Sequence, residues 1–197
     1  MLTIMPTEHL PDPPPDPKKL RALAHPLRWK LIDLLDSEGT ATATRCAEVL
    51  GESVASCSYH LGILGKYGYT EHVPGQAGKE KPWRTADRSQ DLLPPGLDAE
   101  GTLAAEAAME AFLDHELARI KERARRHDLE PEEWVQASRV AGATTWMTAA
   151  ELHEISDQLM RLVVMHEERA ENPAARPPGA REVRLFVAAT VAPATKP

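Results

Sequence analysis

The sequence predicts a mainly helical fold with a small amount of β structure. Apolar residues recur at intervals near 3.6 over several segments, serine or threonine precedes some of these segments and glycine follows them, and only a few short runs suit strands. With 197 residues the chain is long enough for one domain with a real core or for two small ones. We expect an arm over 1–17, a first domain over 18–90 and a second domain over 91–197.

Prolines at 6, 11, 13, 14, 15 and 17 predict that the arm is extended. The N-terminus lacks the basic region, apolar run and cleavage site of a secretory signal. No stretch has about eighteen consecutive apolar residues, so we expect no membrane partner. The chain's 2 cysteines form no disulfide framework. These features together predict a cytoplasmic protein.

Residues 18–39 predict two consecutive helices. Pro26 marks the break between a short helix and a longer one, and Gly39 ends the second. The apolar positions that define the helical period are Leu20, Leu23, Leu27, Leu31, Leu34 and Leu35.

Two further helices are predicted on either side of the turn GES. Thr42 is expected to cap a helix over 43–50, which Gly51 ends. Ser53 is expected to cap a helix from 54 to about 67, with Gly68 in a left-handed exit position.

The helix over 54–67 is predicted to have two unlike sides. Cys57, Leu61 and Leu64 share one stripe that must face a core, and His60, one residue off it, is expected to form a hydrogen bond at the core's edge. Small or hydroxyl-bearing residues lie on the opposite side or at the leading end: Ser53, Val54, Ala55, Ser58, Tyr59 and Gly62. Such a helix is about 20 Å long and about 10 Å across. It fits a major groove about 12 Å wide.

A β-hairpin is predicted next, with strands in YTEHV and KPWRTA joined by PGQAGKE. The two helices before it match a helix-turn-helix, and the hairpin supplies a wing. Lys79, Lys81 and Arg84 lie where a wing could contact phosphate or a minor groove. Residues 18–90 hold eleven Lys and Arg against eight Asp and Glu, although the whole chain has a net charge of -7.

The segments AHPLRWKLIDLL, GTATATRCAEVLGES, VASCSYHLGILGKYGYTEHV and the hairpin, in this order, resemble the ArsR-type winged-helix repressors. The resemblance covers residues 18–90. It implies a homodimer in which each protomer places one recognition helix in a major groove of a two-fold DNA operator. The usual DNA-facing positions of that family fall on Val54, Ala55, Ser58 and Tyr59.

We therefore expect a sequence-specific DNA-binding transcription regulator, a repressor. Its predicted DNA contacts are Thr44, Arg45, Ser53, Val54, Ala55, Ser58, Tyr59, Lys66, Lys79, Lys81 and Arg84. The recognition helix is poor in Lys and Arg, so a winged-helix protein-interaction module with weak or no DNA binding is the alternative. Because phosphate contacts make affinity fall steeply with salt, the salt dependence of binding separates the two.

Many ArsR-type relatives sense metals, so a metal-responsive repressor is a further alternative. The family's cysteine ligand positions fall on Thr42 and Thr44, which are poor ligands for soft metals. Cys46 and Cys57 are predicted to act as small buried apolar residues. The remaining helical histidines form no pair at i and i+4. No metal ligand and no other cofactor is predicted, although a site shared across a dimer is left open.

One long helix over 98–127 is predicted to have two apolar faces. The first face is predicted to pack on a partner helix in a homodimer, through Leu103, Ala107, Leu113, Leu117 and Ile120. A core helix of a monomer is the alternative. The second face holds Ala105, Ala108, Met109 and Phe112.

Residues 131–192 are predicted to form a small α/β unit, in the order helix, strand, helix, strand. The strands are RVAGATTWM and REVRLFVAATV, and Thr148 caps a helix over about 149–170. Apolar residues here line either a core or a cavity for a small organic effector, and the candidate pocket residues are Met109, Phe112, Trp134, Trp146 and Met160. The chain lacks a glycine-rich phosphate loop, a G-x-S-x-G elbow and an H-E-x-x-H motif, so no enzyme activity is expected.

Overall fold

The computed structural model describes residues 16–74, 80–86, 92–166 and 168–193. Most of the predicted arm, Lys79 and the tip of the predicted hairpin lie outside these residues. The chain divides into two compact units, Met1–His115 and Glu116–Pro197, each described by itself below. The predicted domain boundary at residue 90 stays a prediction.

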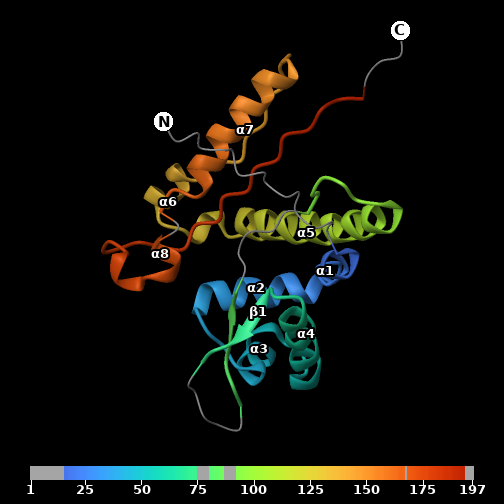
Figure 1. Ribbon diagram of the computed structural model, residues 1–197. Coiled ribbons are helices and arrows are strands. Elements are labelled where there is room, and N and C mark those ends of the chain that lie inside the picture. The colour runs from blue at the N-terminus through green and yellow to red at the C-terminus, as the bar shows by residue number, and fades with distance from the viewer. Residues whose placement is uncertain (1–15, 75–79, 87–91, 167, 194–197) are drawn as a thin grey trace, which may run out of the picture. The chain divides into compact units, whose positions relative to one another are not determined.

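The first unit begins with α1 (Pro17–Arg21), α2 (Pro26–Glu38), α3 (Ala43–Leu50) and α4 (Val54–Lys66) (Figure 1). The predicted caps are present: the Thr42 side chain accepts a hydrogen bond from the backbone N–H of Arg45, and the Ser53 side chain accepts one from Ser56. Gly51 ends α3 with φ 69°, a left-handed conformation that glycine adopts without steric cost. Local capping chemistry therefore sets where these helices start and stop.

The predicted hairpin strands are confirmed as an antiparallel pair, β1 (Thr70–His72) and β2 (Trp83–Thr85). In their register Glu71 faces Arg84 and His72 faces Trp83. Trp83 also forms a bridge with Ala41, through backbone hydrogen bonds of 2.8 and 3.0 Å. The sheet is thereby joined to the segment between α2 and α3, close to the helix-turn-helix.

The core of the first unit lies where α2, α3 and α4 meet. The predicted stripe is confirmed, because Cys57, Leu61 and Leu64 are each 0% exposed. The indole N–H of Trp29 donates to the carbonyl of Leu23 at 2.8 Å, which satisfies the one polar atom of a buried ring. Other fully buried members are Leu31, Leu35 and Cys46.

The long helix α5 (Ala99–Arg125) is confirmed, and the division between the two units falls inside it. Its first part closes the core of the first unit with Ala108 and Ala111. Met109 and Phe112, predicted as pocket residues, pack against the same core, and the Phe112 ring lies 4.9 Å from that of Trp29. These two side chains therefore act as packing residues of the first unit.

The second unit continues α5 and adds α6 (Glu132–Ala137), α7 (Ala149–Val163) and α8 (Glu168–Glu171), with 3-10 turns at His127–Leu129 and Pro173–Ala175. Thr148 caps α7 with a full capping box. The helix ends earlier than predicted, because the chain reaches a left-handed conformation at His166, φ 78°. Within the described part of the chain, α6, α7 and α8 bury no side chain fully.

The predicted small α/β unit is wrong for the part of the chain that the structure describes. The segments 139–147 and 181–191 contain no helix and belong to no strand pair. An alternating apolar pattern favours extended backbone, yet a strand also requires a neighbour that completes its hydrogen bonds. Within its described residues, the chain has no helix that is long and apolar enough to cross a membrane.

Candidate nucleic-acid interface

The helix-turn-helix of the first unit is held by a tight turn between α3 and α4. The backbone N–H groups of Gly51 and Glu52 both donate to the carbonyl of Ala47. Cys46 of α3 and Cys57 of α4 are buried, and burial raises the pKa of the Cys46 thiol to about 11. Both cysteines therefore act as small apolar residues that fix α4 against α3.

The outer face of α4 is exposed and narrow. At about 100° per residue, the predicted DNA-facing positions span about 140° of the helix, and the buried stripe occupies a separate sector centred about 120° away. Tyr59 is 63% exposed and Val54 is 45% exposed. The other exposed positions of this face are Ser53, Ala55, Ser58, Gly62 and Lys66. We call these seven residues the outer face of α4.

A polar cluster supports this face from behind. The Nδ1 atom of His60 accepts a hydrogen bond from Nε of Arg28 at 3.1 Å, which confirms the predicted hydrogen bond of His60. The His25 ring centroid lies 4.2 Å from that of His60, and the Tyr59 ring meets His60 edge-on at 5.2 Å. Burial, followed by His25 and Arg28, lowers the pKa of His60. A neutral imidazole therefore lies directly under Tyr59 at neutral pH.

Two of the predicted DNA-contacting arginines are paired within the protein. The Arg45 guanidinium contacts both carboxylate oxygens of Glu38, at 2.7 to 3.2 Å, and reaches Glu48 at 3.8 Å. Nη2 of Arg84 lies 2.6 Å from Oε1 of Glu71. In each pair a carboxylate therefore competes with a phosphate for the arginine.

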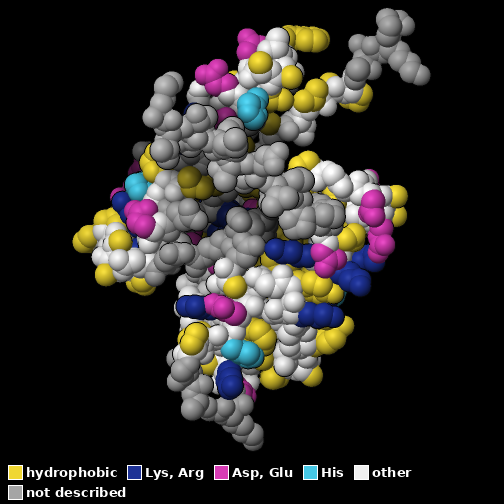
Figure 2. Space-filling view, in the orientation of Figure 1, with side chains coloured by type: hydrophobic (Ala, Val, Ile, Leu, Met, Phe, Trp, Pro, Cys, Tyr) yellow, Lys and Arg dark blue, Asp and Glu magenta, His cyan; other side chains and the backbone are white. Residues whose placement is uncertain are grey.

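The remaining predicted DNA contacts differ in whether their polar groups already bind another side chain of the protein. The Thr44 hydroxyl donates to Oε1 of Glu80 at 2.9 Å. Lys66 and Lys81 are exposed, and Nζ of Lys66 lies 5.3 Å from the centroid of the Tyr67 ring. On the side of the molecule seen in Figure 2, Lys and Arg side chains lie beside acidic and hydrophobic ones.

Sequence reasoning missed the acidic partners Glu38 and Glu71. Glu71 had a detectable signal, since a register of the hairpin strands places it opposite Arg84. Glu38 had none, because it reaches Arg45 across the end of α2 and a bend, outside any helical period.

The five predicted dimer positions on α5 differ in exposure. Leu103, Leu113 and Leu117 are 64%, 36% and 46% exposed, Ala107 is exposed, and Ile120 is half-buried. This row of apolar side chains is left open by the described residues of the chain. A homodimer stays a prediction.

The predicted effector pocket is not assembled within the second unit. Trp146 is 99% exposed and Met160 is 56% exposed, so neither lines an enclosed cavity. Trp134 is half-buried and lies under the Arg181 guanidinium, 4.9 Å from the ring centroid. Effector binding stays a prediction.

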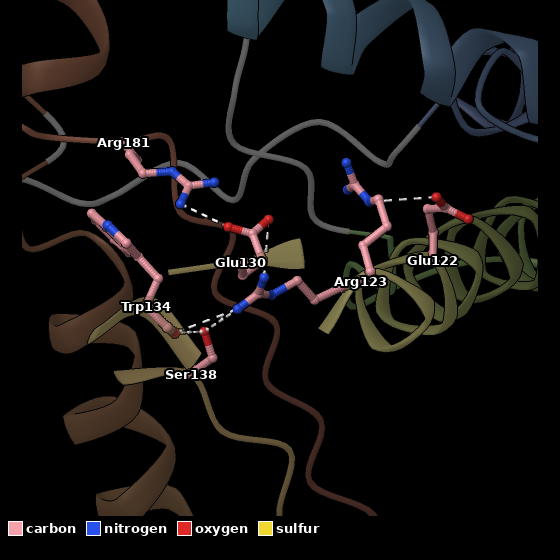
Figure 3. A network of polar contacts seen from close by, with 7 residues as sticks. Glu122, Arg123, Glu130, Trp134, Ser138 and Arg181 are labelled. Atoms are coloured by element: carbon pink, nitrogen blue, oxygen red, sulfur yellow. Dashed lines mark hydrogen bonds and ion pairs between the residues drawn. The ribbon is translucent and has the colours of Figure 1, made fainter. Parts of the chain in front are cut away.

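Arginine–carboxylate pairs organise the second unit instead (Figure 3). Glu130 receives Nη1 of Arg123 at 3.2 Å and Nη1 of Arg181 at 2.8 Å, and the hydrogen bond from Arg181 is the main cause that lowers the pKa of Glu130. Glu116, only 1% exposed, contacts Nη2 of Arg184 at 2.5 Å. These contacts fasten the extended C-terminal segment to the rest of its own unit.

The first unit thus combines a helix-turn-helix with an adjoining two-stranded antiparallel sheet, the arrangement of a winged helix-turn-helix. No family model matches the chain, and no curated protein matches it. Among solved structures, the chain is similar to a mutant of MarR from E. coli, with 14% identity, a TM-score of 0.30, and coverage of 74% of this chain and 88% of the other. Superposition at this level is too poor to bear on fold or function, and the predicted ArsR-type resemblance stays a prediction.

Proposed function

We propose that the chain is a sequence-specific DNA-binding transcription regulator that places the outer face of α4 in a major groove. The observation that carries this proposal is the form of that face. It is exposed, it bears hydroxyl groups and small side chains, and it is set apart from a stripe of the same helix that is fully buried. A face of this shape lets a helix about 10 Å across enter a groove about 12 Å wide.

Phosphate contacts in this proposal come from few cations. Lys66 and Lys81 are exposed, whereas Arg45 and Arg84 are already paired with carboxylates. With these two exposed lysines, log affinity is expected to fall by roughly two for each decade of salt per protomer. Base contacts from α4 must therefore supply much of the binding.

In the proposal the regulator acts as a homodimer and as a repressor. The exposed leucines of α5 support a dimer, since a row of Leu103, Leu113 and Leu117 left in water is unfavourable. Two recognition helices must lie about 34 Å apart to reach successive major grooves. Release by a small organic effector that changes this separation is the regulation we propose.

A protein-interaction module is the second candidate, and the pairing of Arg45 and Arg84 with carboxylates is the observation that favours it. A metal-responsive repressor has no such support, because the described part of the chain holds no group of three His, Cys, Asp or Glu side chains that could bind a metal ion.

The test is selection from a pool of random duplexes by the full chain, followed by titration of the enriched duplex. Tyr59→Ala is expected to weaken binding about tenfold, because it removes an aromatic ring and a hydroxyl from the outer face of α4. Leu129→Ala is the control, since Leu129 is 81% exposed in the second unit. No enrichment of any duplex, even at low salt, would favour the protein-interaction module.

A further inference from the structure

Apart from Lys66 at its last turn, the outer face of α4 lacks the side chains that read guanine and adenine most directly. From Val54 to Gly65 the helix contains no Arg, Lys, Asn or Gln, and its first cation is Lys66 at the last turn. Bidentate contacts to guanine come from Arg or Lys, and those to adenine come from Asn or Gln. If this face reads bases, it must do so largely by other means.

Apolar side chains stand at the end of α4 that leads into a groove. Val54 is the first residue of the helix and is 45% exposed, and Ala55 beside it is also exposed. The N-terminal residues of a recognition helix are those that contact base edges. The apolar group that a base pair presents in the major groove is the 5-methyl group of thymine.

The surroundings of Val54 leave its two methyl groups available for contact. Ser53 and Ala55 are small, and Ser58, one turn further along the same side, is also small and exposed. A β-branched side chain in a helix holds essentially one rotamer. Val54 therefore loses little conformational freedom when a methyl group packs against it.

We infer that α4 recognises a thymine in each half-site through its 5-methyl group, with Val54 as the main contact and Ala55 beside it. This inference rests on the proposed DNA-binding function and deepens it. The hydroxyl groups of Ser58 and Tyr59 then serve neighbouring base pairs as hydrogen-bonding groups. Specificity would come from shape and methyl contact rather than from charged side chains.

The experiment uses the full chain and the duplex that it enriches from the random pool. Deoxyuridine replaces thymidine at one position at a time, which removes the methyl group and preserves the base pair. At the recognised position, affinity is expected to fall about fourfold, the effect of burying one methyl group. Replacement in both half-sites is expected to cost about sixteenfold, since the two free-energy losses add.

A matched pair of variants locates the contact on the protein. In Val54→Ala the penalty for deoxyuridine at that position is expected to shrink to less than twofold. In Val49→Ala, on α3, the penalty is expected to stay about fourfold, and Val49 is as exposed as Val54, at 45%. Both variants leave the buried core intact.

The outcomes separate this inference from the proposed function. Enrichment of a duplex in which deoxyuridine costs nothing at any position would overturn the inference alone, as would a penalty that Val54→Ala leaves unchanged. Failure to enrich any duplex would overturn the proposed function and the inference with it.

Discussion

Gly65 is the point at which the wing packs most closely on α4. A Cβ atom at this position would lie 2.7 Å from Cζ3 of Trp83 and 3.2 Å from its Cη2. The Trp83 ring cannot easily retreat, because its backbone is bonded to Ala41 and its ring lies 3.7 Å from that of His72. We therefore predict that Gly65→Ala suffers an overpacking penalty of about 1–3 kcal/mol.

Gly62 provides the matched control, since a Cβ atom there meets nothing within 4 Å. Gly62→Ala is expected to raise the free energy of unfolding by about 1 kcal/mol, the helix propensity that alanine gains over glycine. The same gain applies at Gly65, so the difference between the two variants isolates the penalty from Trp83. Gly65→Ala should be less stable than Gly62→Ala by about 1–3 kcal/mol.

Urea unfolding of the full chain, followed by circular dichroism at the helix band, measures this difference. With a denaturant slope of about 2 kcal/mol/M, the midpoints of the two variants should differ by about 0.5–1.5 M. Combining each variant with Trp83→Phe, which removes the ring atoms that Cβ meets, should abolish the difference. Equal midpoints for Gly65→Ala and Gly62→Ala in the parent chain would refute the packing of the wing on α4.

Three further predictions follow from buried and paired groups. Glu38→Gln should strengthen duplex binding, because it frees Arg45 for a phosphate. The slope of log affinity against log salt concentration should steepen by about one. Unchanged binding in a titration would mean that Arg45 faces away from DNA. The pKa of His60 is lowered in the folded chain, so the unfolded chain binds more protons as the pH falls below about 6.5. The free energy of unfolding, measured in urea, should therefore decrease as the pH falls below about 6.5. His60→Gln should flatten this dependence, and an unaltered profile would exclude His60 as its source. Cys46 and Cys57 should resist alkylation by iodoacetamide until the chain unfolds, because both are buried. With a pKa of about 11, only about one Cys46 thiol in three thousand is ionised at pH 7.5. Rapid labelling of the folded chain, detected by mass spectrometry, would contradict their burial.

The helices of the first unit could be predicted because their signals are local. A capping residue and a left-handed glycine define the ends of α3, and the spacing of Cys57, Leu61 and Leu64 defines the buried side of α4. Each signal lies within a few residues of its effect. The side of α4 that faces solvent followed directly from the side that is buried.

The second unit shows where the sequence pattern was insufficient. Val183, Leu185 and Val187 alternate as in a strand, yet the segment pairs with no strand among the described residues, and these three side chains stay exposed. Whether an extended run pairs depends on a neighbour distant in the sequence, which alternation does not encode. The same limit applies to the ion pairs of Glu38 with Arg45 and of Glu116 with Arg184.

The candidate site was predictable in outline but not in its electrostatics. Composition shows a local excess of Lys and Arg, whereas the structure shows that Arg45 and Arg84 are held by carboxylates. Charge counts along a sequence do not tell which charges are neutralised by contacts across the fold. The proposed interface therefore depends more on Val54, Ser58 and Tyr59 than the charge count indicated.

Ser58 lies in the middle of the outer face of α4, and a glutamate there would bring a negative charge against the base edges. The most direct test is the dissociation constant of the enriched duplex for the parent chain, for Ser58→Glu and for Gln158→Glu, which adds the same charge on the exposed side of α7. Ser58→Glu is predicted to weaken binding at least a hundredfold, and Gln158→Glu less than twofold. Equal dissociation constants for all three proteins would show that α4 does not enter the groove.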